Sequence, residues 1–434
     1  MWRESSFWLG FTTFANKKAV RNRKTMSEKK ENSPIFFIFI TLLIDVMGIG
    51  IIIPVLPKLI QELTHTDLSE SALYSGWLIA SYALMQFICS PIVGGLSDRY
   101  GRRPVLLLSL AGLGIDYLFL ALAPSIGWLF VGRLIAGIAG ASFTTASAYI
   151  ADISTPEKRA QNFGVVGAAF GLGFIIGPFL GGLLGELGHR VPFYAAACMS
   201  LLNCIYGFFI LPESLAVENR RAFEWKRANP VSSLLNLKKY PVLFGLVGCL
   251  VCTNLAGQVH PSTWALFTMK EFAWSPAQVG YSLAFVGLMI AFVQGFLIRK
   301  AVPALGENRS IKIGLFFFFG GFFLFSFASQ GWMMYAIMVP FSLSGFAGPT
   351  LQGLISKQVP PDAQGELQGA LTSLISISTV VAPLAATYLF SYFTSAGAIV
   401  HFPGAAFFMG GLLGLLAWLI FLNAQPASSI KERV

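Results

Sequence analysis

Two carboxylates and one guanidinium group lie where the sequence is otherwise apolar. Of the 20 acidic residues, only Asp45 and Asp116 fall near the middle of long apolar stretches, and Arg133 is the one basic residue inside such a stretch and away from its ends. A charge at the centre of a lipid bilayer costs about 2.5–3.5 kcal/mol on insertion scales, so it marks function by default. Arg133 can form an ion pair with one of the two carboxylates, and that pair can serve only to fix the packing of the helices. Alternatively, one of the carboxylates takes up and releases protons.

The other reactive side chains give weaker signals. The four histidines fall toward the expected outer loops, away from any relay at mid-depth: His65, His189, His260 and His401. Cys249 and Cys252 have CxxC spacing, but no second pair accompanies them and all five cysteines lie in apolar runs. No HExxH, GxSxG or P-loop pattern occurs. We therefore expect no enzymatic activity, no metal site and no cofactor.

Membrane-spanning helices must position these residues, because the composition suits lipid. The chain has 434 residues, of which 55% are hydrophobic and 12% are charged, about half the charged fraction of a soluble domain. This composition excludes a soluble enzyme, a disordered chain and a disulfide scaffold. The net charge of +10 does not arise from a solvated basic patch, so we expect no nucleic-acid partner. Twelve segments are long and apolar enough to cross a hydrocarbon core of about 30 Å: 35–60, 73–96, 104–123, 127–150, 162–186, 191–211, 241–265, 279–298, 311–328, 331–355, 367–391 and 401–423.

A polar and charged stretch at 212–240 splits the twelve spans into six and six. The halves also resemble each other, since Gly127-Trp128 opens span four and Gly331-Trp332 opens span ten. Such a repeat implies two six-helix bundles related by an axis along the membrane normal, with a cavity between them that opens to one side at a time. We therefore predict an all-α integral membrane protein that works by alternating access. The expected divisions are a basic N-terminal arm (1–33), a first bundle (34–211), a central loop (212–240), a second bundle (241–424) and a tail (425–434).

The basic residues predict the orientation. Only Lys58, Arg190 and Lys270 fall at the span ends or connections of one side, and Arg133 lies within a span, which leaves 26 of the 30 basic residues on the other side. The positive-inside rule places that side, with both termini and the central loop, in the cytoplasm. The first 25 residues have a short apolar part before a basic cluster, the reverse of a secretory signal, and Met26 is an alternative start. We expect a multi-pass protein of the plasma (inner) membrane.

The connection between spans two and three carries a second group of candidates, a gating loop. Its residues of interest are Gly95, Asp98, Arg99, Gly101, Arg102 and Arg103. Glycines allow a tight turn, and Asp98 can pair with a nearby arginine or a helix N-terminus. A basic loop that only obeys the positive-inside rule is the simpler interpretation. The residue order resembles the loop signature of the major facilitator superfamily, which implies a twelve-helix transporter gated at this loop.

Span five carries a third group. It contains Gly164, Gly173, Gly177, Pro178, Gly181 and Gly182. Small residues let helices pack closely, and a proline within a span predicts a bend. The spacing also resembles the antiporter motif of the drug–proton antiporter branch of the superfamily, with every position filled. This resemblance favours an exporter over an importer.

Several further segments resemble the tetracycline-resistance efflux proteins of that branch. They include Asp45-Val46-Met47-Gly48-Ile49-Gly50, Ile115-Asp116-Tyr117, Gly132-Arg133-Leu134-Ile135-Ala136-Gly137, Tyr149-Ile150-Ala151-Asp152-Ile153, Leu211-Pro212-Glu213-Ser214 and Gly365-Glu366-Leu367-Gln368-Gly369. The similarity covers about residues 35–425 and implies export of drugs in exchange for protons. By this resemblance, Asp45 and Asp116 are substrate- or proton-linked carboxylates, and Arg133 is their cationic partner. Gln258 and Gln294 are expected to line the cavity.

Departures from that family bear on the cargo. The family typically has a histidine in span eight and a third buried carboxylate in span nine, where this chain has Ile290 and Phe318. The second-half loop has Ile298 where the first-half loop has Asp98. A metal-chelated tetracycline is a polar, charged guest, and a cavity must replace its hydration with fixed polar groups. We therefore expect a more lipophilic, aromatic cargo.

The leading hypothesis is a secondary active transporter, namely a proton-coupled antiporter that exports small, partly hydrophobic organic compounds. The proton gradient supplies its energy. A proton symporter, or a facilitator for a sugar or other metabolite, is the alternative within transport. A membrane-embedded enzyme lacks a motif, and a transport-inactive sensor or scaffold does not account for the presence of Asp45, Asp98 and Asp116 together. The expected partners are a small-molecule substrate, protons and the lipid bilayer, with a monomer as the functional unit.

Overall fold

The computed structural model describes residues 35–140, 142–155, 158–223, 243–360 and 364–424. Within those ranges the chain is helical and contains no strand. The predicted basic arm, the tail and most of the central loop (224–240) lie outside the described residues, so the expectations for them stay predictions.

Helices of the first half account for its six predicted spans. They are the first helix (Ile35–Ile52), α2 (Leu56–Thr64), α3 (Leu68–Tyr100), α4 (Arg102–Leu122), α5 (Ile126–Ala139), α6 (Ser142–Ile153), α7 (Arg159–Glu186) and α8 (Val191–Ile210). The span predicted over 35–60 is divided into two helices, because the first helix ends at Ile52 and α2 begins at Leu56. Pro54 lies in the break, where its missing amide hydrogen cannot continue the helical hydrogen bonding.

Helices of the second half account for its six predicted spans in the same way. They are α10 (Phe244–Phe272), α11 (Pro276–Phe292), a π-helical segment (Val293–Leu297), α12 (Ile298–Leu305), α13 (Glu307–Ser326), α14 (Gly331–Phe341), a 3-10 segment (Ser342–Phe346), α15 (Ala347–Ser356), α16 (Gln364–Thr394) and α17 (Ala405–Asn423). Within the described ranges, eleven helical stretches are long and apolar enough to cross a membrane. Helix α10, with 29 residues, is long enough to be the one remaining span of the twelve predicted. Its middle is more polar than those of the other eleven stretches because it holds Asn254, Gln258 and His260. Polar groups within a span usually face a bundle interior or a cavity.

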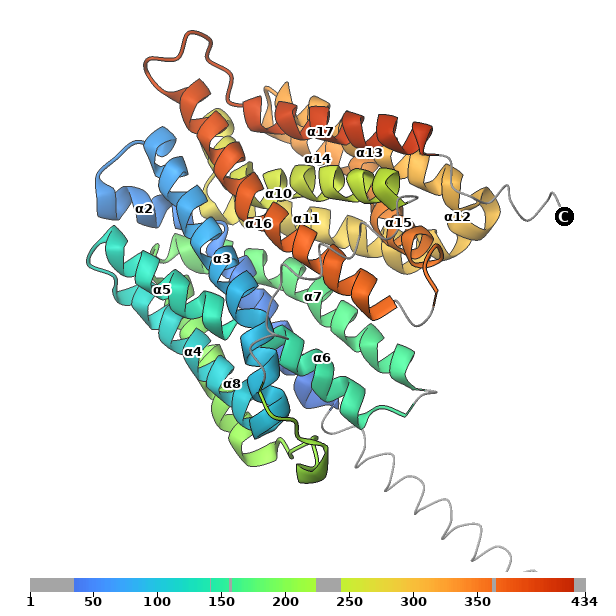
Figure 1. Ribbon diagram of the computed structural model, residues 1–434. Coiled ribbons are helices and arrows are strands. Elements are labelled where there is room, and N and C mark those ends of the chain that lie inside the picture. The colour runs from blue at the N-terminus through green and yellow to red at the C-terminus, as the bar shows by residue number, and fades with distance from the viewer. Residues whose placement is uncertain (1–34, 141, 156–157, 224–242, 361–363, 425–434) are drawn as a thin grey trace, which may run out of the picture.

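The two halves contact each other mainly through two helix pairs (Figure 1). Helix α3 lies along α16, and α7 lies along α11. Ser69 Oγ donates to the Thr394 carbonyl oxygen at 3.0 Å, and the Ala277 amide donates to Glu186 Oε1 at 3.1 Å. These contacts join the halves where α3 begins and α7 ends, which we call the closed end. The opposite end, where α3 is followed by α4, is the basic end.

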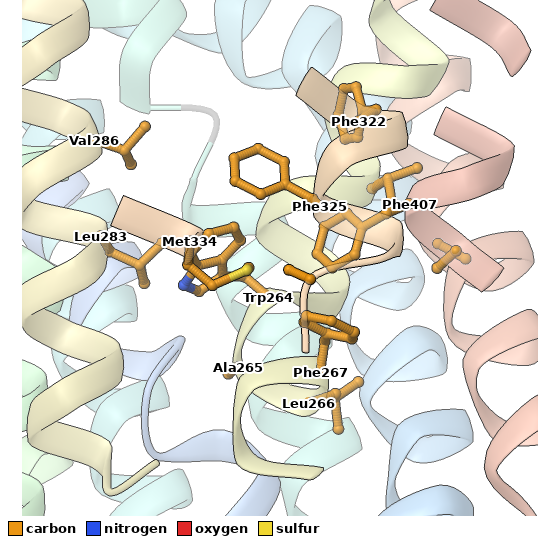
Figure 2. Packing of buried hydrophobic residues seen from close by; sticks show 14 of the residues in the cluster. Trp264, Ala265, Leu266, Phe267, Leu283, Val286, Phe322, Phe325, Met334 and Phe407 are labelled. Carbon is orange, nitrogen blue, oxygen red and sulfur yellow. The ribbon is translucent and has the colours of Figure 1, made fainter. Parts of the chain in front are cut away.

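Aromatic side chains form much of the core of the second bundle, as Figure 2 shows. The rings of Trp264 and Phe325 lie 5.3 Å apart at 90°, and those of Phe267 and Phe407 lie 5.1 Å apart at 88°. Such edge-to-face pairs add about 0.5–1.5 kcal/mol to the gain from burial alone. The Trp264 indole N–H also donates to Ser282 Oγ at 2.9 Å, which ties α10 to α11 and fixes the indole ring.

Candidate functional site

Asp116 of α4 and Arg133 of α5 form an ion pair inside the first bundle. The two helices form a hairpin, because α4 ends at Leu122 and α5 begins at Ile126. Arg133 Nη2 donates to Asp116 Oδ2, and the Asp116 side chain has no exposed surface. Gly132 leaves room for the carboxylate, since a Cβ there would lie 2.7 Å from Asp116 Oδ1. That oxygen is buried and has no hydrogen-bond partner among the described residues.

Two tyrosines surround this ion pair and connect it to neighbouring helices. The Arg133 guanidinium lies over the Tyr82 ring of α3, 5.8 Å from its centroid, a cation–π arrangement. Tyr117 follows Asp116 on α4, and its hydroxyl packs against Gly48 of the first helix, where a Cβ would collide with it. Asp45 lies one turn before Gly48, is 9% exposed, and is close enough to act electrostatically on Tyr82 and Tyr117. The structure thus gathers the intramembrane charges predicted from sequence into one bundle.

Arg102 organises the connection between α3 and α4 at the basic end. Its Nη1 donates to Asp98 Oδ1 at 2.5 Å and to Ser97 Oγ at 2.7 Å. Its Nε donates to Asp152 Oδ2 at 3.1 Å. Because Asp152 lies near the end of α6, the Arg102 side chain links three helices of the first half.

Glu213 caps the start of α4, a contact that the sequence-based set of site residues lacks. Glu213 Oε1 accepts from the Arg102 amide at 2.8 Å, and Oε2 accepts from the Arg103 amide at 3.2 Å. These amides have no partner within the helix, and an anion at a helix N-terminus is favoured by the helix dipole. Gly101 precedes them with a φ of +106°, a conformation that favours glycine. Two signals in the sequence point to Glu213: it is the first acidic residue after the apolar run of span six, and it belongs to one of the segments that resemble the efflux proteins.

The other gating-loop residues lie on the same connection. Arg103 Nη2 donates to the Phe208 carbonyl oxygen at 2.6 Å, which attaches α4 to the end of α8. The Arg99 guanidinium lies 5.1 Å from the ring centroid of its neighbour Tyr100. Gly95 faces Phe223, since a Cβ there would lie 2.9 Å from that ring. The described contacts of these three residues therefore stabilise the first half itself.

A glycine stripe on α7, made of Gly173, Gly177 and Gly181, packs against the first helix. The three residues lie about one helical turn apart and so share a face. A Cβ at Gly177 would lie 2.6 Å from the Met47 carbonyl oxygen, and a Cβ at Gly173 or Gly181 would also collide with the first helix. Backbones approach this closely only where side chains are absent. The stripe therefore places α7 directly against the helix that carries Asp45.

The remaining residues of the predicted antiporter motif have different surroundings. Gly182 faces α11, where a Cβ would lie 2.6 Å from the Pro276 carbonyl oxygen. Pro178 lies inside α7, and its carbonyl oxygen faces Gly280 of α11. Gly164 has open space, since none of the described heavy atoms lies within 4 Å of a Cβ built there. The residues of the motif thus fall into three groups. The glycine stripe contacts the first helix, Pro178 and Gly182 contact the second half, and Gly164 has no close neighbour among the described atoms.

A cavity of about 580 Å³ lies between the halves, on the basic-end side of the contact between Gly182 and Pro276. Both Ile290 and Phe318 line it, so the apolar departures noted in the sequence face this space. Its walls are mainly aromatic and aliphatic, with contributions from Ile53, Phe170, Phe174, Leu283, Val286, Ile290, Phe318, Phe322 and Phe341. Among the described residues that line it there is no Asp, Glu, Lys or Arg. Asp45 and Asp116 therefore lie outside the cavity wall.

Three polar side chains, His260, Gln294 and Ser344, line this cavity. The structure places Gln294 in the wall, as the resemblance implies, whereas Gln258 is half-buried and is not among the lining residues. The expectation that all four histidines lie toward outer loops is wrong for His260. The predicted span ended at residue 265, but α10 continues to Phe272 and so moves His260 toward the middle of the helix. The other histidines lie in or next to connections between helices: His65, His189 and His401.

Comparisons with known proteins agree with this architecture. Residues 38–383 match the family model of the Major Facilitator Superfamily. The chain is 40% identical to the class C tetracycline resistance protein of Escherichia coli over 381 residues, which cover 88% of this chain and 96% of that protein. It is 31% identical to multidrug resistance protein 2 of Bacillus subtilis, over 68% of this chain and 72% of that protein.

Among solved structures, the human organic anion transporter MFSD10 (TETRAN) superimposes with a TM-score of 0.67 and 25% identity, covering 90% of this chain and 99% of that one. A bacterial homolog of the human lysosomal transporter Spinster gives a TM-score of 0.71 at 15% identity, covering 90% and 96% of the two chains, and shows the shared fold. The described helices and these relatives identify a multi-pass membrane protein. The chain belongs to the Major Facilitator Superfamily of secondary active transporters and is a relative of its tetracycline resistance proteins.

Proposed function

We propose that the protein is a proton-coupled antiporter that exports small, partly hydrophobic organic compounds by alternating access. The observation that carries this proposal is the presence of two separate sites in one chain. A buried ion pair between Asp116 and Arg133 lies within the first bundle, and a largely apolar cavity lies between the halves. Relatives named for tetracycline or multidrug resistance support export of drugs over uptake of a metabolite.

In this proposal the ion pair is the proton-dependent contact. An ionised Asp116 attracts the Arg133 guanidinium strongly because little water screens the two charges. Protonation of Asp116 removes that attraction and leaves Arg133 to its contact with the Tyr82 ring. The contacts that hold the α4–α5 hairpin therefore differ between the two protonation states of Asp116. A carboxylate that alternates between such states can exchange protons with either side of the membrane.

The coupling path from this pair to the cavity runs through the first helix. Tyr117 packs on Gly48, so a shift of α4 is passed to the first helix. The first helix packs on the glycine stripe of α7, and Phe170 and Phe174 of α7 line the cavity. Protonation at Asp116 thereby changes the position of a cavity wall. Asp45 lies on the same first helix and is placed to take part as a second carboxylate.

The protein is proposed to lie in the plasma (inner) membrane with its basic end in the cytoplasm. With the closed end outward, the described arrangement has its cavity displaced toward the cytoplasm, the side from which an exporter collects its cargo. Labelling of single-cysteine variants with an impermeant reagent tests this orientation. A cysteine at Thr66 should react from outside intact cells, and one at Lys226 should not. The opposite labelling pattern would contradict the proposed orientation and therefore the proposed direction of transport.

The proposed cargo is lipophilic and aromatic. Flat hydrophobic molecules, including cations bound at ring faces, suit walls that contain Phe318, Phe322 and Phe341. A chelated metal–tetracycline complex does not, because none of the described lining residues carries a charge.

Expression in a drug-sensitive host tests the proposal. We expect growth on ethidium or acriflavine at concentrations that stop the host, and little protection against tetracycline. Strong, magnesium-dependent tetracycline resistance would contradict the proposed cargo. Movement of a compound and protons in the same direction across energised vesicles would show symport and overturn the proposed antiport.

A further inference from the structure

Span four is divided into two helices about two turns beyond Arg133. Helix α5 ends at Ala139 with Gly140 as its C-terminal cap, and α6 begins at Ser142. We call this division the α5–α6 junction. The last carbonyl groups of a helix have no partner within it. Gln86 of α3 supplies one here, because its Nε2 atom donates to the Gly140 carbonyl oxygen at 3.1 Å. A side chain that replaces a backbone partner in this way allows a helix to bend.

The ion pair and the junction contact the same stretch of α3. Tyr82 precedes Gln86 by one turn of α3, and its ring contacts the Arg133 guanidinium. The Tyr82 hydroxyl also reaches the junction, since a Cβ at Gly140 would lie 2.7 Å from that oxygen and 3.3 Å from Gln86 Nε2. Between these points the backbones are close, because a Cβ at Gly137 would lie 2.6 Å from the Tyr82 carbonyl oxygen. Side chains of α3 therefore link the ion pair to the junction.

The far end of α6 is bound to the gating loop. Asp152 Oδ2 accepts from Arg102 Nε and from Ser214 Oγ, each at 3.1 Å. The Tyr149 hydroxyl donates to the Pro212 carbonyl oxygen at 3.0 Å. A change of angle at the junction therefore displaces the carboxylate that holds Arg102.

The near end of α6 contacts a wall of the cavity. The Phe143 ring of α6 lies 5.1 Å from the Phe170 ring of α7 at 81°, an edge-to-face contact. Phe170 lines the cavity, and Phe143 follows Gly140 by three residues. Cargo that changes the position of Phe170 therefore acts on α6 close to the junction.

We propose that the α5–α6 junction is the hinge at which cargo and proton act on each other, and that Gln86 is the positioning residue that holds it. The inference rests on the proposed antiport and names the contact that couples its two sites. An ionised Asp116 holds Arg133, whereas a neutral Asp116 leaves Arg133 to the Tyr82 ring, so the support of the hinge changes with the proton. Because coupling of binding sites is reciprocal, cargo at Phe170 changes proton binding by the same factor.

The charged and titratable groups around Asp116 come from four helices. Arg133 on α5 is its ion-pair partner, and Tyr117 is its neighbour on α4. Tyr82 comes from α3 and Asp45 from the first helix. Helix α8 also packs against α4 and, along its whole described length, contains no Asp, Glu, Lys, Arg or His. Tyrosine ordinarily titrates near pH 10, so the two carboxylates account for a pH dependence near neutrality.

Equilibrium titration of the purified protein with ethidium, the cargo probe, tests the inference without a proton gradient. In antiport the cargo binds when Asp116 is ionised, so we expect the affinity to rise with pH by about fivefold or more. Gln86→Met has a side chain of similar length, keeps every charge and removes the amide donor. It should make the affinity nearly independent of pH while ethidium still binds. Attraction between carboxylates and a cation would give the same pH dependence in both proteins.

Two further variants complete the titration. Ser90→Ala, one turn further along α3, removes a hydrogen bond to the Gln86 carbonyl oxygen within the helix and should keep the wild-type pH dependence. Phe143→Leu removes the ring contact with Phe170 and should reduce that dependence from the cargo side. A wild-type affinity that ignores pH, an unchanged dependence in Gln86→Met or Phe143→Leu, or its loss in Ser90→Ala would each overturn the inference.

Hydrogen–deuterium exchange without cargo tests the hinge itself. After correction for the intrinsic effect of pH, backbone amides near the junction should exchange at different rates at acidic and alkaline pH in the wild type. They should show no such difference in Gln86→Met or in Asp116→Asn with Arg133→Gln. Exchange in the wild type that does not respond to pH would overturn the inference. Failure of ethidium to bind would contradict the proposed cargo, while this measurement still decides the hinge, so the two proposals remain distinguishable.

Discussion

Arg133 on α5 donates a hydrogen bond to the fully buried carboxylate of Asp116 on α4, and the second oxygen of that carboxylate has no partner among the described residues. Such a pair has large opposing energies, because desolvation of both charges offsets their attraction. Because Arg133 bonds only one of the two oxygens of this carboxylate, protonation of Asp116 is enough to break the ion pair. This property suits a group that must change state during transport.

Removal of one partner of this pair should destabilise the protein more than removal of both. Asp116→Asn leaves the Arg133 charge without its carboxylate, which typically costs about 3–5 kcal/mol in a buried site. The double variant Asp116→Asn with Arg133→Gln leaves no unpaired charge and should regain much of that loss. Thermal unfolding of the purified proteins in detergent measures the difference. Equal unfolding temperatures for wild type and Asp116→Asn would mean that the carboxylate is already neutral in the folded protein.

Asp98→Asn should slow transport without harming the fold. Arg102 retains Asp152 and Ser97 in this variant, and a partly exposed ion pair such as Asp98–Arg102 contributes at most about 1 kcal/mol. The proposed role of Asp98 is to hold the basic ends of the two halves together in the opposite state of the cycle. Initial transport rates and probe affinity measured on the same preparation separate rate from binding. An unchanged rate would remove Asp98 from the gate, and Glu218→Gln, in an exposed stretch of the central loop, is the matched control.

Gly181→Ala should destabilise the first bundle, whereas Gly164→Ala should not. A Cβ at Gly181 would lie 2.7 Å from the Ile51 Cα, so the first helix must move away, and such overpacking costs roughly 1–3 kcal/mol. At Gly164 a Cβ meets open space, and alanine favours the helix by about 1 kcal/mol over glycine. Unfolding temperatures of the two variants provide the comparison. Equal effects would show that the stripe does not govern packing between α7 and the first helix.

Glu186→Ala should loosen the closed end. Glu186 Oε1 accepts from the Ala277 amide in the first turn of α11, so the carboxylate joins the halves and also favours the α11 dipole. We expect a single cysteine placed at Ser344 in the cavity to react several-fold faster with an impermeant maleimide added outside intact cells. Asp67→Ala is the control, because Asp67 caps α3 within the first half through the Glu70 amide. Equal labelling of Glu186→Ala and the Asp67→Ala control would exclude Glu186 from the closure of this end.

The spans could be predicted from sequence because a bilayer demands long apolar helices. The break at Pro54 was absent from that prediction, since apolar length alone does not register a proline near the end of a span. The pairings of α3 with α16 and of α7 with α11 also could not be predicted. In lipid, an apolar side chain that faces another helix looks the same in sequence as one that faces the acyl chains.

The candidate site was only partly accessible from sequence. Asp116 and Arg133 stand out because charge within a span is rare, and the structure pairs them. His260 escaped notice because its distance from the membrane surface depends on where α10 ends, and the apolar run past residue 265 was assigned to a connection. Glu213 caps a helix that is distant in sequence, and only the fold brings it to the Arg102 amide.

Proton movement driven by cargo tests the central claim most directly. Proteoliposomes that contain a pH-sensitive dye report proton flux when ethidium is added on one side. For the wild-type protein, we predict ethidium-dependent proton flux in the direction opposite to ethidium. For Asp116→Asn with Arg133→Gln, we predict ethidium exchange that continues while the proton flux falls at least tenfold. Undiminished proton flux in the double variant, or protons that accompany ethidium in the wild type, would contradict the account.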